Sequence, residues 1–286
     1  MNEIEIAWLS HRRRVFDVGY RMTGSVSDAD DVVQETYVRL LKHGVDDVLD
    51  LEAWLVTVAA RVCLDRLRAT ARHDGYIGPW LPEPIVTTSL PEDRVTLDDS
   101  VRLALLMVLE QLSPAERTSF LLHDVFGLPF EEIAAVVGRT EAACRQLASR
   151  ARRHIAAERT EPKKRVERAE LERVAARFAA ASAAGSFDEL VAVLDPDVTG
   201  DFDSGGVIPG APYDALHGSA NVASQLVRSF VGVDASFQVA AVNGDPGVVV
   251  AVAGQVVAVI VLDSDHGLVR EIHAIGNPAK LTHVTI

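Results

Sequence analysis

The sequence contains few of the residues from which disulfide frameworks and zinc sites are built. Only two of its 286 residues are cysteines, Cys63 and Cys144, and each falls within a pattern of apolar residues at helical spacing. Two thiols so far apart in helical segments indicate neither a disulfide network nor a cysteine-based metal site. We therefore expect a protein of a reducing compartment, the cytoplasm, with no metal and no cofactor.

Long apolar runs are also missing. The longest stretch, residues 248–262, is interrupted by Gly254 and Gln255 and is too short to span a bilayer as a helix. The first residues, MNEIEIAWL, are acidic where a signal peptide would be basic. Both absences argue against a membrane-bound or secreted protein and favour cytoplasmic localisation.

An excess of positive charge, the usual mark of a nucleic-acid-binding protein, is absent as well. The formal net charge is -13, and the acidity is uneven: from residue 169 to the end there are five Lys and Arg against fourteen Asp and Glu. The whole molecule would therefore attract nucleic acid poorly. Any such binding has to use local basic surfaces.

The N-terminal part contains two segments with helical periodicity. Residues 28–42, DADDVVQETYVRLLK, place Val32 and Leu40 on one face and leave acidic and polar side chains on the others. Residues 51–72 repeat the spacing, and their polar face consists mostly of arginines. Residues 74–93 then contain four prolines and two glycines without a sustained period, which predicts a linker.

Residues 127–155, GLPFEEIAAVVGRTEAACRQLASRARRHI, have the pattern of a helix-turn-helix. The first helix is expected over residues 131–137, Gly138 allows a positive φ at the turn, and Thr140 is a good N-cap for the second helix. The inner face of the second helix is predicted to contain Ala143, Cys144, Leu147 and Ala151. Its outer face presents arginines that can reach guanine edges and phosphates. The alternative is an amphipathic helix pair whose arginines are merely solvated.

The pattern changes after residue 169. One helix is expected to about residue 184, and the clearest β-like runs are residues 248–252, 255–262 and 268–275, with turn-forming residues between them. A helix followed by a meander of strands predicts an α+β domain with a curved antiparallel sheet.

The order of these segments resembles a known family. A helix with an acidic start, a WL…AAR…LDRLR helix, a proline-bearing linker and the stretch LSPAERTSFLLHDVFGLPFEEIAAVVG follow one another within residues 6–157. This order resembles the extracytoplasmic-function (ECF) sigma factors of bacterial RNA polymerase. WLPEP at residues 80–84, the α+β domain and GNPAKL at residues 276–281 are similar to the subgroup with a fused C-terminal SnoaL-like domain, the sigma J type.

The resemblance implies a multidomain fold with two all-α domains and a C-terminal α+β SnoaL-like cone with a curved antiparallel sheet. The implied segments are a sigma-2 domain over residues 1–73, a linker over 74–93, a sigma-4 helix-turn-helix domain over 94–158, a connector over 159–168 and the SnoaL-like domain over 169–286. The chain departs from the family at two points. Ala279 stands where relatives usually have Asp, and the turn at residues 203–206 has fewer glycines than theirs.

The implied function is that of an alternative sigma factor, which binds the RNA polymerase core through the β′ clamp helices and the β flap and directs initiation at promoters with -10 and -35 elements. The resemblance assigns core docking to Asp28, Asp31, Gln34 and Glu35, contact with the -10 element to Arg61, Arg68 and Arg72, and contact with the -35 element to Arg145, Gln146, Ser149, Arg150, Arg152 and Arg153.

In this subgroup the appended domain acts as a regulator in place of a separate anti-sigma factor, so the sequence requires no such partner. Its carboxylates could mask the basic helices or repel DNA. The expected regulatory contacts are formed by Trp80, Pro82, Pro84, Asn277, Pro278, Lys280 and Leu281.

SnoaL-like relatives form a cone-shaped pocket, and some of them are enzymes. Here Asp201, Asp203, His217 and His273 could line such a pocket, with His217 as a base. Because the interior is otherwise rich in Val and Ala, we expect a non-catalytic domain. Two other interpretations stay open: a one-component, ligand-sensing DNA-binding regulator, and a pocket enzyme fused to helical domains.

Overall fold

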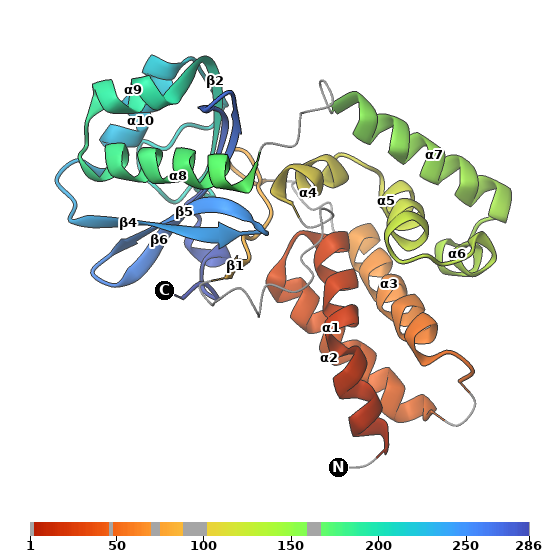
Figure 1. Cartoon of the computed structure of the whole chain (residues 1–286). Helices are drawn as coiled ribbons and strands as arrows, with labels where there is room; N and C mark the ends of the chain where they lie inside the picture. The colour runs from red at the N-terminus through yellow and green to blue at the C-terminus, as the bar shows by residue number, and fades with distance from the viewer. Residues whose placement is uncertain (1–2, 46–47, 70–74, 88–101, 159–166, 286) are drawn as a thin grey trace. The chain divides into compact units, whose positions relative to one another are not determined.

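The chain forms two compact units (Figure 1). The structure, a computed structural model, describes residues 3–45, 48–69, 75–87, 102–158 and 167–285. The first unit consists of Met1–Arg72 and Ala104–Pro162, and the second of His73–Leu103 and Lys163–Ile286. The stretch between the two helical modules is therefore grouped with the C-terminal residues.

The first unit begins with three packed helices, α1 (Glu3–Thr23), α2 (Val26–His43) and α3 (Leu51–Ala69). Val18, Leu40 and Leu55 are almost fully buried among them. The helices α1 and α2 approach closely at Gly19, where a Cβ atom would lie 2.9 Å from the Cα atom of Ala29. The two predicted helices are present here, and residues 70–72 of the second lie outside the described residues.

The same unit continues with α4 (Leu103–Glu110), α5 (Pro114–Phe120), the π-helical turn η3 (Leu121–Val125), α6 (Phe130–Val137) and α7 (Glu141–Glu158). A capping box formed by Ser113 and Glu116 starts α5. The predicted turn is present between α6 and α7: Gly138 has a φ of 72°, and the Thr140 hydroxyl accepts a hydrogen bond from the Ala143 N–H at 3.2 Å.

The inner face of α7 differs from the prediction at two positions. Cys144, Ala148, Ala151 and Ile155 are buried, whereas the predicted Ala143 and Leu147 are only half-buried. Because a helix has 3.6 residues per turn, spacings of four and three keep positions 144, 148, 151 and 155 on one face. The outward face is accordingly rotated slightly away from Leu147, and it retains the arginines.

Within its described residues, the second unit is built on a seven-stranded sheet whose strand order is β1-β4-β5-β6-β7-β2-β3. Its strands are β1 (Val86–Thr87), β2 (Leu194–Asp203), β3 (Leu216–His217), β4 (Ala235–Val242), β5 (Asp245–Val252), β6 (Gln255–Asp265) and β7 (Leu268–Ile275). The expectation of an antiparallel sheet needs one correction, because β2 pairs with β7 in parallel. A parallel pair needs a long crossover, and β2 and β7 are indeed far apart in the chain.

Helices α8 (Arg168–Ala183), α9 (Phe187–Val193) and α10 (Ser219–Phe230) supply the helical part of this unit, and Figure 1 shows α8 lying across the strands. Together with one face of the sheet they enclose a continuous apolar core. Its members include Phe178 of α8, Val222 of α10, Phe202 of β2 and Ile272 of β7. The helix-covered face of the sheet is thus filled with apolar side chains.

Part of the predicted linker belongs to this sheet. Val86 and Thr87 form β1 and pair with Val242 and Ala241 at the edge of β4. The Asn243 side chain strengthens this junction, since its Oδ1 atom accepts a hydrogen bond from the Ile85 N–H at 3.1 Å. The described part of the linker therefore has a fixed place in the second unit, and residues 88–93 lie outside the described residues.

Candidate functional site

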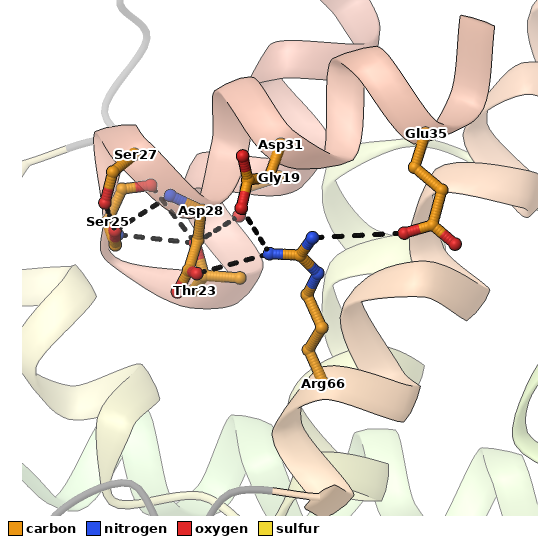
Figure 2. A network of polar contacts seen from close by, with 8 residues as sticks. All are labelled: Gly19, Thr23, Ser25, Ser27, Asp28, Asp31, Glu35 and Arg66. Carbon is orange, nitrogen blue, oxygen red and sulfur yellow. Dashed lines mark hydrogen bonds and ion pairs between the residues drawn. The ribbon is translucent and has the colours of Figure 1, made fainter. Parts of the chain in front are cut away.

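The acidic residues expected to dock on polymerase converge on one arginine. In Figure 2 the guanidinium of Arg66 in α3 faces Asp28, Asp31 and Glu35 of α2. Its Nη1 atom lies 3.4 Å from Asp28 Oδ1 and 3.1 Å from Asp31 Oδ2, and its Nη2 atom lies 3.9 Å from Glu35 Oε2. Gln34, the fourth predicted residue, is exposed on α2. No local pattern distinguishes Arg66 from the other arginines of α3 as the one that meets this surface.

Hydroxyl groups fix the start of α2 beside these carboxylates (Figure 2). Ser25 is the N-cap, and its Oγ atom accepts a hydrogen bond from the Asp28 N–H at 3.0 Å. Thr23 Oγ1 donates to the Gly19 carbonyl at 2.8 Å, and the hydroxyls of Ser25 and Ser27 are 2.9 Å apart. The backbone that carries Asp28 and Asp31 is thus held in one conformation, with acidic side chains at the positive end of the helix dipole.

Two arginines that the resemblance assigns to the -10 element are engaged with the first helix of the helix-turn-helix. Arg68 Nη2 donates to the Val137 carbonyl at 3.0 Å, and Arg61 Nη2 donates to the Ala135 carbonyl at 3.4 Å. These carbonyls lie in the last turn of α6, where a helix has unsatisfied acceptors and partial negative charge. Arg72 lies outside the described residues.

The outer face of α7 carries all the residues predicted for the -35 element. Two of them make ion pairs on this surface: Arg145 lies 2.5 Å from Glu141 one turn earlier, and Arg152 makes two contacts with Asp124, at 2.9 and 3.0 Å. The six predicted residues, all exposed, are Arg145, Gln146, Ser149, Arg150, Arg152 and Arg153. Exposed ion pairs of this kind contribute little and are readily exchanged for contacts with DNA phosphates.

A buried ion pair, with the hydrogen bonds around it, joins the linker to β2 and the C-terminal tail. Lys280 Nζ lies 2.6 Å from Asp203 Oδ2, and the same carboxylate accepts hydrogen bonds from the Leu81 N–H at 2.9 Å and from the Tyr76 hydroxyl. Lys280 also donates to the Leu81 carbonyl. Both charged side chains are more than nine-tenths buried, so each depends on the other for compensation. We call this group, with Trp80 and Asn277, the linker-tail lock.

Aromatic rings and an amide complete the linker-tail lock. The Lys280 ammonium lies 4.2 Å from the ring centre of Trp80 and 5.0 Å from that of Tyr76, distances at which cation–π attraction acts. Asn277 Nδ2 donates to the Tyr76 hydroxyl at 2.9 Å. Burial, followed by the hydrogen bond to Asp203, raises the pKa of Tyr76. The phenol therefore stays protonated and donates to the carboxylate.

The glycine turn after β2 fits closely around this lock. Gly205 and Gly206 have φ values of 61° and 74°, and a Cβ atom on Gly206 would lie 2.7 Å from the Cβ atom of Ile77 in the linker. A Cβ atom on Gly205 would lie 2.5 Å from Asn277 Nδ2. Two glycines thus suffice for the positive φ angles and for the close approach.

The other predicted regulatory residues lie around the same junction. Pro82, Pro84 and Leu281 are buried, and Pro278 is exposed in the short helix η4 (Pro278–Lys280). The Pro84 carbonyl accepts a hydrogen bond from His283 Nε2 at 2.9 Å. Ala279 is exposed, and its N–H donates to Asn277 Oδ1 at 3.0 Å. The tail therefore folds back on the linker without an acidic side chain at position 279.

The four residues expected around a pocket do not gather on the helix-covered face of the sheet. Side chains alternate along a strand, and Phe202 and Ile272 point into the helix-covered core, so Asp201, Asp203 and His273 lie on the opposite face. Asp203 belongs to the linker-tail lock, and His217 is exposed in β3. The pocket lined by these residues stays a prediction.

Asp201 and His273 do meet, as cross-strand neighbours on β2 and β7. His273 Nδ1 lies 3.2 Å from Asp201 Oδ2, and Nε2 lies 3.7 Å from Glu271 Oε2. Burial alone would lower the pKa of His273, but the hydrogen bonds to the two carboxylates outweigh it and raise the pKa to about 9. Among the described residues no group of His, Cys, Asp and Glu is arranged to hold a metal ion.

Comparison with known proteins connects these surfaces to a family. Residues 8–73 match the model of sigma-70 region 2, and residues 102–155 match that of sigma-70, region 4. The probable ECF RNA polymerase sigma factor SigI of Mycobacterium tuberculosis is 38% identical over 284 residues, which cover 97% of this chain and 94% of that protein. The ECF RNA polymerase sigma factor SigJ of the same organism is 40% identical over 290 residues, covering 95% and 91%.

The fold agrees with this relationship. The crystal structure of the Mycobacterium tuberculosis extracytoplasmic function sigma factor SigJ matches with a TM-score of 0.73 and 35% identity, covering 96% of both chains. In the part of the chain that the structure describes, no helix combines the length and the apolar character needed to cross a membrane. The chain belongs to the ECF sigma factors of RNA polymerase and is an alternative sigma factor of transcription initiation that carries a SnoaL-like domain.

Proposed function

We propose that this sigma factor is regulated by its own SnoaL-like domain, which controls the linker between the two DNA-binding modules. The observation that carries the proposal is the contact of Asp203 and Lys280 with the linker at Tyr76 and Leu81. The linker joins the module that meets the -10 element to the module that meets the -35 element. A domain that holds the linker therefore controls how far apart the two modules can be.

In this proposal the acidic face of α2 docks on the β′ clamp helices of the polymerase core, and the β flap forms a second contact. Asp31 and Glu35 are partly exposed, at 59% and 42% of their side-chain area, and offer acceptors to a basic partner surface. Complementary charge of this kind accelerates association and selects the partner.

In the proposed promoter complex, the -10 element is contacted by Arg61, Arg68 and Arg72. The -35 element is contacted by the outer face of α7. In the structure Arg61 and Arg68 donate to carbonyls of α6. Because these hydrogen bonds tie the two guanidinium groups to α6 through Nη2, we infer that the contacts between α3 and α6 open when the arginines turn toward the -10 element. Release of the linker is the step that would permit this opening.

The C-terminal domain has a regulatory, non-catalytic role in this proposal. The apolar filling of its helix-covered face, with Phe178, Phe202 and Ile272, supports this role. The surplus of acidic residues after position 169 adds repulsion toward DNA to a domain that is covalently joined to the basic helices. A separate anti-sigma factor is not needed in this scheme, and the protein acts in the cytoplasm, where polymerase and promoters are found.

The test is transcription in vitro with core polymerase and a promoter library. Full-length protein is compared with a form that lacks residues 169–286 and with the full-length Asp203→Asn variant. Asp214→Asn is the matched control, because Asp214 is exposed in the same domain. We expect the deletion and Asp203→Asn to change promoter-dependent initiation in the same direction and Asp214→Asn to leave it unchanged. Equal activity of all four proteins would contradict regulation by the domain.

A further inference from the structure

The acidic face of α2 is organised by a residue outside α2. Asp28, Asp31 and Glu35 are spaced by three and four residues, so their carboxylates lie along one face of the helix. Three neighbouring negative charges repel one another and, left alone, would spread apart. Arg66 of α3 meets all three at distances of 3.4, 3.1 and 3.9 Å, as Figure 2 shows.

The contacts use the shape of the guanidinium as well as its charge. Nη1 is shared by Asp28 Oδ1 and Asp31 Oδ2, while Nη2 points to Glu35 Oε2. Each of these ion pairs therefore involves a single oxygen of its carboxylate. A planar fork can serve several acceptors at fixed angles, whereas the ammonium of a lysine acts as a flexible point charge. The arrangement of the three carboxylates thus depends on an arginine at this position.

This cluster contributes little to the stability of the helical bundle. The Arg66 side chain is 32% exposed, and its three partners are between 34% and 59% exposed, so solvent screens the ion pairs. The buried apolar residues of α2 and α3, among them Leu40, Leu55 and Leu64, hold the helices together. The effect of Arg66 is therefore on how the acidic surface is presented.

We propose that Arg66 is a positioning residue for core binding: it holds Asp28, Asp31 and Glu35 in one preset arrangement that a basic surface of the polymerase core recognises. The inference rests on the proposed docking of α2. An ordered acceptor surface loses less conformational freedom on binding than three independent side chains do. The removal of Arg66 makes the surface more negative but less ordered.

The test measures binding of the full-length sigma factor to core polymerase for Arg66→Gln, Arg66→Lys and Arg39→Gln. Arg39→Gln is the control. Arg39 is also partly exposed, its Nη2 atom lies 2.7 Å from Glu35 Oε1, and the substitution removes the same charge. We expect Arg66→Gln to weaken binding by about tenfold and Arg66→Lys by a smaller factor, because lysine keeps the charge and loses the fork. Arg39→Gln is expected to change affinity by less than about twofold, as for other surface pairs.

A double-mutant cycle with Asp31→Asn separates positioning from a general loss of structure. If Arg66 acts through the carboxylates, Arg66→Gln will weaken binding much less once Asp31 is already neutral. Thermal unfolding of each variant is followed in parallel, and Arg66→Lys keeps the test valid should Arg66→Gln unfold. Equal effects of Arg66→Gln and Arg39→Gln, tighter binding by Arg66→Gln, or wild-type binding by Arg66→Lys would each overturn the inference.

Single neutralisations distinguish this inference from the proposed docking itself. If Asp31→Asn and Glu35→Gln leave core affinity unchanged, the docking of α2 through its acidic face is wrong. If they weaken binding while Arg66→Gln does not, docking stands and only the role of Arg66 falls.

Discussion

Lys280 Nζ lies 2.6 Å from Asp203 Oδ2 in a site where both side chains are more than nine-tenths buried. This pair connects the tail to the end of β2, and through Leu81 and Tyr76 it also connects the linker. Loss of one partner would leave the other as a buried, uncompensated charge. The pair therefore makes docking of the linker sensitive to a single substitution.

Asp203→Asn is expected to destabilise the second unit by about 3–5 kcal/mol, the usual cost of removing one partner from a buried ion pair. Amide hydrogen exchange should accelerate first at Leu81, whose N–H loses its charged acceptor. Asp265→Asn serves as the control, because Asp265 pairs with Arg270 at the surface at 3.4 Å and should cost less than about 1 kcal/mol. Unchanged exchange at Leu81 in Asp203→Asn would show that the lock does not hold the linker.

Gly206→Ala should loosen the linker through a steric conflict. Alanine at a φ of 74° costs about 1–2 kcal/mol, and the new Cβ atom, 2.7 Å from that of Ile77, adds about 1–3 kcal/mol. Gly210→Ala is matched in backbone strain, with a φ of 78°, but a Cβ atom there would meet nothing within 4 Å. The measurement is thermal unfolding followed by tryptophan fluorescence. Equal losses in the two variants would mean that Ile77 is not held against the turn.

The parts of the fold that depend on local chemistry could be predicted from the sequence. The turn of the helix-turn-helix needs a residue that tolerates positive φ, then an N-cap, and Gly138 and Thr140 meet these needs in order. The helices 28–42 and 51–72 followed from the spacing of apolar residues, because the periodicity that buries one face is set within a few turns. Each motif is defined by residues close together in the sequence, so the order of the motifs along the chain was enough to indicate the family.

The features that depend on pairing between distant segments could not be predicted. β2 pairs in parallel with β7, with a shift in register between Leu194 and Thr199. This pairing brings Asp201 next to His273 on the face of the sheet opposite Phe202 and Ile272. The two-residue strand β1 lies in the proline-rich linker, where no alternating pattern indicated a strand. Arg66 could not be distinguished from the other arginines of α3 without the packing of α2 on α3.

His273 should make the stability of the second unit depend on pH. Its pKa is raised from 6.5 to about 9 by Asp201 and Glu271, against the effect of burial. The stabilisation is fully present below pH 6.5, declines as the unfolded chain loses its proton and is lost as the pH rises through about 9. The expected loss is at most about 3 kcal/mol. Urea unfolding at pH 6, 7.5 and 9 measures it, and Asp201→Asn should flatten the profile. A wild-type profile as flat as that of Asp201→Asn would contradict this assignment.

Arg145 and Arg153 should differ in what they contribute at the -35 element. Arg145 lies near the start of α7, beside Glu141 and over the ring of Phe130 at 5.4 Å, and the first turns of a recognition helix reach the base edges. Arg145→Ala should therefore weaken binding by about 1–3 kcal/mol and relax the choice of sequence. Arg153 lies two turns further along, so Arg153→Ala should weaken binding to all sequences alike. It should also reduce the slope of the logarithm of the binding constant against the logarithm of the salt concentration by about one. Both are measured with the full-length protein and core polymerase on promoters with altered -35 bases. If Arg145→Ala weakened binding to every sequence equally, Arg145 would be a phosphate contact, and the bases would have to be read by Gln146 or Ser149.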